Sequence, residues 1–190
     1  MASGTMRGRT PLPPPPDFEV IEQASRHPGE RRVAWMALIG DLNFAWSNTE
    51  SLFIYVLMLL IETDEPAAAI IFATLNTTRA RLDLVERLAK IRLRDRALGR
   101  ELAEVTKAFS ACTKLRNELN HATFVLNEAG DITHTQAMKL EERKGSLRFG
   151  AREPVDAARM AKVAAAVAEL YALNRRIWAL LGRLEEGAAR

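Results

Sequence analysis

The chain has 190 residues, of which 48% are hydrophobic, 27% charged and 6% aromatic, with a formal net charge of +3 and a pI near 9.3. This length is sufficient for one domain with a sizeable core, and the mildly basic charge is compatible with nucleic acid without requiring it. The single cysteine, Cys112, excludes an intramolecular disulfide and a cysteine-based zinc site.

The start of the chain is rich in proline. Pro11 and Pro13–Pro16, with scattered glycine, serine and arginine, predict a largely disordered arm over residues 1–29. No apolar signal-peptide core follows, and the longest apolar run, Leu52–Ile61, is shorter than the roughly 20 residues that span a bilayer. We therefore expect a cytoplasmic protein without a membrane partner.

A long helix is predicted from Arg31 to about Glu62, and it carries two apolar stripes. The first stripe includes small residues that would let another helix approach closely, and it comprises Val33, Ala37, Gly40, Phe44, Ser47, Ser51, Ile54, Met58 and Ile61. The second comprises Trp35, Leu38, Leu42, Trp46, Phe53, Val56 and Leu60. A helix of this length either carries a break or forms the spine of the fold. Because a spine with two apolar sides often pairs with a second subunit, we expect a homodimer.

The rest of the chain predicts three more long helices and a small sheet. The helices cover Pro66 to about Asp95, Arg96 to His121, and Pro154 to about Leu184. Partly alternating residues at about 123–150 predict a two- or three-stranded antiparallel insertion. The sequence therefore predicts one all-α domain over 30–185, an up-and-down bundle of four to five helices with a small β-hairpin or sheet after the third long helix. Residues 186–190 are predicted to fray.

Basic side chains are concentrated at residues 79–100, which hold eight basic and three acidic residues. A basic stripe along a helix can follow a phosphate backbone. The candidate RNA-binding residues are Arg79, Arg87, Lys90 and Arg94. The alternative interpretation is a solvated helix face with ion pairs between residues four apart.

The strongest indication of chemistry is the run Arg116-Asn117-Glu118-Leu119-Asn120-His121 at the end of the predicted third helix. Residues four apart share a helix face, so Asn117 lies beneath His121. Arg116 continues an apolar stripe, so its charge needs a partner. A histidine can transfer protons, an arginine can stabilise a charged phosphorane, and an asparagine can orient them. These are the groups that metal-free RNA cleavage requires, and we expect no metal or cofactor. One copy supplies a single histidine, so an acid and a base together require a dimer.

This pattern resembles the HEPN superfamily, in which an arginine, a polar residue and a histidine lie near the end of a helix in a helical bundle. The resemblance covers the helical frame at about 30–185. It implies a dimer whose motifs face each other, and metal-independent endoribonuclease activity of the kind found in toxin, phage-defence and RNA-processing systems, with an antitoxin or another protein as a possible partner. It implies that Arg116 stabilises the transition-state charge, Asn117 supports it, and His121 acts as acid or base.

Two alternatives remain open at this level. In the first, the domain is a non-catalytic RNA-binding or protein-interaction module, in which Arg116 pairs with an inward acid such as Glu50, Asp41 or Asp83 and His121 caps the C-terminus of the helix. In the second, the protein is a structural helical dimer without a ligand.

Three other reactive side chains have ordinary interpretations. His27 lies in the predicted arm and His134 in the predicted sheet, and both are expected at the surface. Cys112 lies on an apolar stripe, so we expect it in the core.

Overall fold

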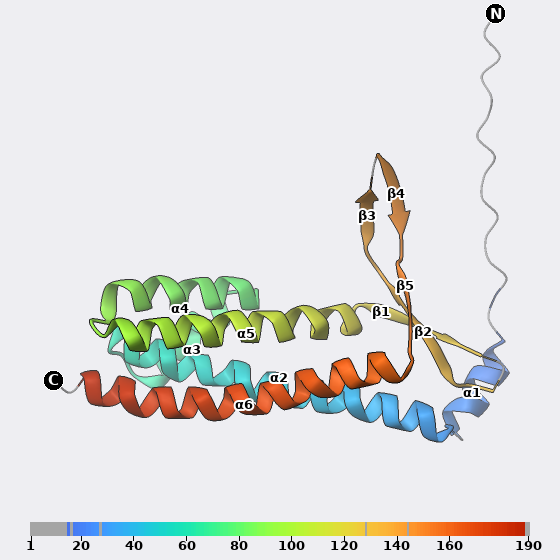
Figure 1. Cartoon of the computed structure of the whole chain (residues 1–190), viewed down its shortest axis with the longest axis horizontal. Helices are drawn as coiled ribbons and strands as arrows, with labels where there is room; N and C mark the ends of the chain where they lie inside the picture. The colour runs from blue at the N-terminus through green and yellow to red at the C-terminus, as the bar shows by residue number, and fades with distance from the viewer. Residues whose placement is uncertain (1–14, 16, 27, 128, 144, 189–190) are drawn as a thin grey trace, which may run out of the picture.

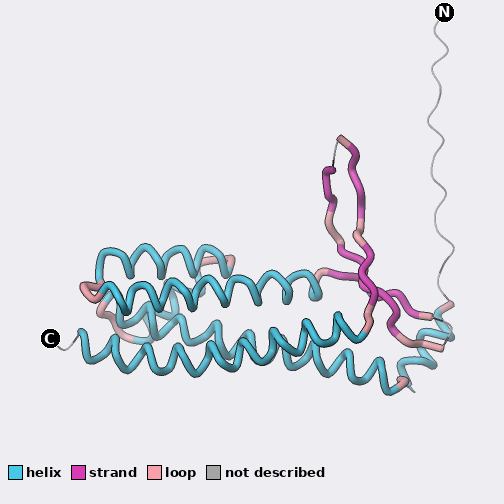
Figure 2. Tube along the Cα trace, viewed as in Figure 1, coloured by secondary structure: helices cyan, strands magenta, loops and turns pink. Residues whose placement is uncertain are grey.

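The computed structural model describes residues 15, 17–26, 28–127, 129–143 and 145–188. The described chain is mainly helical with a small antiparallel sheet, which confirms the predicted fold class at that level (Figures 1 and 2). The helices are α1 (Phe18–Arg26), α2 (Glu30–Ile61), α3 (Glu65–Thr74), α4 (Thr78–Arg92), α5 (Arg96–Asn120) and α6 (Ala157–Ala188). The strands are β1 (Ala122–Leu126), β2 (Ile132–Ala137), β3 (Leu140–Arg143), β4 (Ser146–Phe149) and β5 (Arg152–Pro154).

Helix α2 is the spine of the molecule, as predicted, and packs against α3, α4, α5 and α6. It ends where Glu62 adopts a left-handed conformation with φ 54°. Its second predicted stripe forms much of the core, whereas the first is exposed in its N-terminal half, with Val33 51% and Phe44 62% accessible. The helix is long and apolar enough to cross a membrane by length and composition, but half of its most apolar window is buried inside the fold. In the C-terminal half of α2 the first stripe also packs against the core through Ile54 and Ile61, so only its N-terminal half is left uncovered.

The predicted single helix over residues 66–95 is wrong, because the chain forms α3 and α4 with a sharp turn between them. Leu75 leaves the helical conformation with ψ 111°, and Thr77 begins α4 by accepting a hydrogen bond from the Ala80 N–H at 3.1 Å. The run Asn76-Thr77-Thr78 contains good N-cap residues but neither glycine nor proline. The predicted helix starts near Pro66 and at Arg96 are confirmed, since Asp64 and Asp95 cap α3 and α5, whereas α4 ends at Arg92 rather than at about Asp95.

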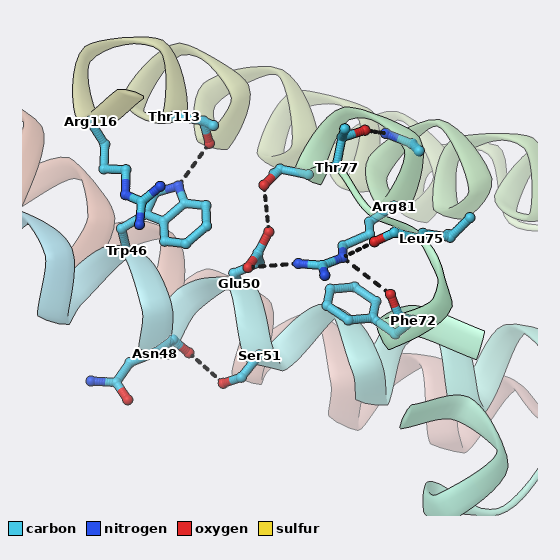
Figure 3. A network of polar contacts seen from close by, with 12 residues as sticks. Trp46, Asn48, Glu50, Ser51, Phe72, Leu75, Thr77, Arg81, Thr113 and Arg116 are labelled. Atoms are coloured by element: carbon cyan, nitrogen blue, oxygen red, sulfur yellow. Dashed lines mark hydrogen bonds and ion pairs between the residues drawn. The ribbon is translucent and has the colours of Figure 1, made fainter. Parts of the chain in front are cut away.

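A buried polar network fixes this turn on α2 (Figure 3). Glu50 accepts a hydrogen bond from the Thr78 hydroxyl at 2.6 Å and forms an ion pair with Arg81 at 3.1 Å. The Arg81 Nε donates to the carbonyls of Phe72 and Leu75 at 3.1 and 3.0 Å. The network thus links α2, the end of α3 and the start of α4.

Replacing Glu50 with alanine should lower the free energy of unfolding by about 3 kcal/mol, because it leaves the Arg81 charge in a largely buried site without its carboxylate. Urea denaturation measures the effect. Asp83→Ala is the matched control: its pair with Arg79 is long, at 3.9 Å, and exposed, so we expect a loss of about 0–1 kcal/mol. Equal losses in the two variants would contradict a structural role for the network.

The predicted β insertion between α5 and α6 is confirmed, but it extends to residue 154. The predicted start of the last helix at Pro154 is therefore wrong: Pro154 ends strand β5, and α6 begins at Ala157. Strands β1, β2 and β5 form an antiparallel sheet in the order β1-β2-β5, and β3 and β4 pair as a separate hairpin. Figure 1 shows this hairpin projecting away from the bundle axis, while β1 and β2 continue from the end of α5. The insertion therefore stands directly beside the Arg116–His121 segment.

Both ends of the chain differ from the prediction. Residues 18–26, assigned to the disordered arm, form α1, whose first turn is capped when Asp17 accepts a hydrogen bond from the Val20 N–H at 3.1 Å. Helix α6 continues to Ala188, beyond the predicted fraying at 186, because no proline interrupts it. Within the predicted arm, residues 1–14, 16 and 27 lie outside the described part of the chain, as do residues 189 and 190. The predicted surface position of His27 therefore falls outside the described residues.

Candidate functional site

The Arg116 side chain lies across α2, near the end of α5. Its guanidinium carbon is 4.2 Å from the centre of the Trp46 ring, and Figure 3 shows the group stacked over the indole. The Nε donates to Asn43 Oδ1 at 3.0 Å, and Nη1 donates to Asn117 Oδ1 at 3.1 Å. Arg116 is half-buried, as its position on the apolar stripe predicts, and the Trp46 ring covers one face of its planar guanidinium.

A second layer holds these partners in place. Trp46 Nε1 donates to the Thr113 hydroxyl at 2.9 Å, and its ring stacks on Phe109 with a centroid separation of 5.8 Å. The Asn120 amide, with its oxygen toward the guanidinium, accepts from Arg116 Nε and Nη2 at 2.9 and 3.2 Å and lies against the Asn43 amide. Asn43 in turn donates to the Ile39 carbonyl at 2.9 Å. Because Trp46 and Asn43 are themselves fixed, the guanidinium is preorganised.

No carboxylate neutralises Arg116 among the described residues, since none of their ion pairs includes it. Glu50 pairs with Arg81, Asp83 lies beside Arg79, and Asp41 is exposed. The predicted alternative in which Arg116 pairs with one of these three acids is therefore wrong. Its positive charge is held entirely by neutral groups.

His121 occupies the C-cap position of α5, where its backbone N–H donates to Asn117 O at 3.1 Å. The imidazole is exposed, and within the described chain it has no hydrogen bond or ion pair. Asn117 directs its amide oxygen to Arg116 rather than to His121. The motif thus consists of an arginine–asparagine pair and a histidine that is free to contact a ligand.

Two hollows meet at this motif. The first, of about 910 Å³, lies between the start of α4 and α5 and includes Arg116, Asn117 and His121 in its lining. The second, of about 770 Å³, lies between the end of α5 and the β insertion, and Asn117 and His121 line it too. The predicted catalytic residues therefore open on common, solvent-accessible space.

Of the four predicted RNA-binding residues, one lines a hollow at the Arg116–His121 motif. Arg79 lines the 910 Å³ hollow. Lys90 lines a smaller hollow of about 350 Å³ farther along α4 and α5, and Arg87 and Arg94 are exposed but line none of the three. The basic stripe thus runs along α4 away from the motif.

Sequence reasoning missed four residues that shape the site. Asn43 and Trp46 hold Arg116 from positions 73 and 70 residues earlier in the chain, and Lys107 and Lys114 add positive charge to the 910 Å³ hollow. Trp46 belonged to a predicted core stripe, which indicates burial but not a cation above the ring. Lys107 and Lys114 lie seven positions apart on α5. Other pairs on this helix, such as Thr113 and Asn120, have the same spacing, so it does not distinguish the two lysines as functional residues.

Cys112 is buried on the core side of α5, which confirms its predicted place. Burial raises the pKa of its thiol, and the nearby Glu169 carboxylate raises that pKa further. At pH 8 the thiol is therefore protonated, and iodoacetamide should modify it more than about tenfold more slowly in the native protein than in urea. Equal rates in the two conditions would contradict this assignment.

Within the described residues, no group of three or more histidine, cysteine, aspartate or glutamate side chains is arranged to hold a metal ion. Comparison of the chain with protein-family models, with curated proteins and with solved structures gives no match. The resemblance to HEPN domains therefore rests on the motif and on its place in the helical frame.

Proposed function

We propose that this protein is a HEPN-like, metal-independent endoribonuclease that acts as a homodimer. The observation that carries the proposal is the state of Arg116, which is fixed in place yet lacks a carboxylate partner. A preorganised cation that faces solvent beside a free histidine is suited to a phosphate group.

The charges of the 910 Å³ hollow support an anionic ligand. Its two acids are both engaged: Asp83 lies beside Arg79, and Glu86 accepts the Thr106 hydroxyl hydrogen bond at 2.7 Å. Lys107 and Lys114 line the same hollow and take part in no ion pair among the described residues. Positive charge therefore predominates next to Arg116, as binding of a phosphate backbone requires.

The proposed chemistry uses the ribose of the substrate as the nucleophile. A base takes the proton of the 2′-hydroxyl, the 2′-oxygen attacks the adjacent phosphorus, and the bond from phosphorus to the 5′-oxygen breaks. Arg116 stabilises the charge of the phosphorane, and an acid donates a proton to the leaving 5′-oxygen. The products are a 2′,3′-cyclic phosphate and a 5′-hydroxyl, which RNA cleavage in the presence of EDTA followed by end analysis would detect.

The dimer supplies the second histidine. Its proposed interface is the outer face of α2, defined by Val33, Met36, Ala37, Gly40 and Phe44, which are all exposed. A side chain at Gly40 would meet no atom within 4 Å, so the backbone there is open to close approach by another helix. Asn43 directly precedes Phe44, so pairing through this face brings two copies of the Arg116 site near each other.

The alternative is a module that binds RNA without cutting it. The observation in its favour is that His121 has no partner to orient its ring among the described residues. Wild-type protein that binds single-stranded RNA but leaves it intact would select this alternative. Protein that does neither would favour a structural helical dimer.

Asn43→Ala should weaken RNA binding and cleavage by about tenfold, because Arg116 loses the acceptor that fixes its Nε. Fluorescence anisotropy and cleavage rates measure the two effects. Asn48→Ala, on the same helix and exposed, is the control and should resemble wild type. If Asn43→Ala is fully active, Arg116 does not need the orientation seen here.

A further inference from the structure

The hollow beside the β insertion contributes a second part of the substrate site. We propose that it binds an unpaired nucleotide next to the cleaved phosphate, with the base against the insertion. This inference deepens the proposed function, since it assigns single-stranded RNA, read on one side of the cut, as the substrate.

The first support is continuity. Lys114, Asn117 and His121 line both the 910 Å³ hollow and the 770 Å³ hollow, so the motif stands where the two meet. An RNA strand whose cleaved phosphate lies at Arg116 and His121 would extend into one hollow before that phosphate and into the other hollow after it. This arrangement fits a cut inside a chain better than removal of a terminal nucleotide.

The second support is the chemistry of the lining. The β-insertion side of the hollow is formed largely by small or apolar side chains, namely Ala122, Ala137, Met138 and Ala151. Met138 is 58% exposed and available for contact with a flat ring. By contrast, threonine, serine and charged side chains dominate the other hollow. One side of the motif is therefore suited to a base and the other to the backbone.

The third support is electrostatic. The carboxylates of this hollow, Glu118 and Glu153, both pair with Arg159, whose side chain is 5% exposed. Lys114 and Lys139 line the hollow and have no ion pair among the described residues. Arg159 offsets one of the two negative charges, and Lys114 and Lys139 add two positive ones, so the group has a net charge of +1 and attracts a phosphate.

The lining favours an unpaired base. The apolar residues can contact a base only when it is free of its helical stack, and recognition of this kind targets single-stranded RNA. Contacts between a base and such a surface typically change affinity by about five- to 150-fold.

The test uses a single-stranded RNA oligonucleotide that has one deoxyribose at the expected cleavage position, so that it has no 2′-hydroxyl there and cannot be cleaved. In one version an abasic site lies on the 5′ side of this position, and in another it lies on the 3′ side. Binding is measured by fluorescence anisotropy for wild type, Met138→Glu and Leu140→Glu. Leu140 is the matched control because it is also exposed, at 61%, and lines neither hollow. We expect an abasic site on one side to weaken wild-type binding about tenfold, to do the same in Leu140→Glu, and to have no effect in Met138→Glu.

An abasic penalty that is unchanged in Met138→Glu would overturn this inference while leaving the proposed nuclease intact. Wild type that binds this oligonucleotide with the expected pattern, yet never cleaves the all-ribose version, would refute cleavage and retain the base site. Failure of wild type to bind either oligonucleotide would refute both. Equal affinity for the strand annealed to its complement would also contradict an unpaired substrate.

Discussion

Replacing His121 with alanine should reduce the rate of RNA cleavage by about 10²–10⁴-fold, because positioned proton transfer contributes roughly that much to catalysis. The imidazole is exposed and makes no contact that stabilises the described fold, and the backbone N–H that caps α5 is retained in the variant. The melting temperature should therefore change little. Cleavage of a labelled single-stranded RNA in EDTA gives the rate, and circular dichroism confirms the helices.

The chain provides a matched control for this experiment. His134 is also an exposed histidine, and it lies on β2 of the adjacent sheet but lines neither hollow at the motif. His134→Ala should cleave at the wild-type rate. If both variants lose activity equally, or if His121→Ala remains active, the proton transfers must be assigned to other groups.

Arg116 provides a complementary measurement. Arg116→Lys keeps a positive charge but loses the planar group that stacks on Trp46 and donates to two asparagines. A variant that binds RNA almost normally but cuts it slowly would separate transition-state stabilisation from simple attraction of the phosphate.

Local sequence patterns were sufficient for the helices that carry the motif. The apolar period and the Asp95 cap define α5, and they place Arg116 on its inward side, where it is half-buried. The alternation after His121 predicts the β insertion, because β1 pairs with β2, and β3 with β4, next to each other in the chain; only the pairing of β2 with β5 skips a hairpin. Such features depend on residues only a few positions apart.

Contacts between segments that are far apart in the chain could not be predicted from such local patterns. Periodicity indicates that Arg116 needs a partner, but the candidates it offered were acids, whereas the structure uses Asn43 and the face of Trp46. Glu50 is taken by Arg81, which depends on the turn between α3 and α4 that the helical pattern concealed. The break arises because one hydroxyl at Thr77 caps a new helix, an effect that a smooth apolar stripe does not reveal.

The two stripes of α2 show what composition can and cannot predict. Both are apolar in the sequence, but the packing of a single chain covers the second stripe and only the C-terminal half of the first, and it leaves Phe44 exposed. The first stripe therefore has no structural role within the monomer in its N-terminal half. An exposed face that combines large apolar residues with small ones is typical of a helix that pairs with another copy.

Replacing Phe44 with aspartate should convert the protein to a monomer and abolish cleavage. A two-fold interface contains each substitution twice, so two carboxylates replace two apolar rings, and we expect dimer affinity to fall by about 100-fold or more. The side chain is 62% exposed in the monomer, so the fold should be preserved. Size-exclusion chromatography with light scattering gives the mass, and the cleavage assay gives the activity of the same samples.

Ile91→Asp is the control, because Ile91 is 77% exposed on α4 and lies outside the proposed interface. This variant should remain dimeric and active. A Phe44→Asp protein that is monomeric but fully active would show that one chain supplies both the acid and the base, whereas a dimer that persists in this variant would place the interface on another face. Loss of both the dimer and the activity, with α5 and its Arg116 contacts intact, would show that catalysis requires the dimer, as a mechanism with two copies of His121 predicts.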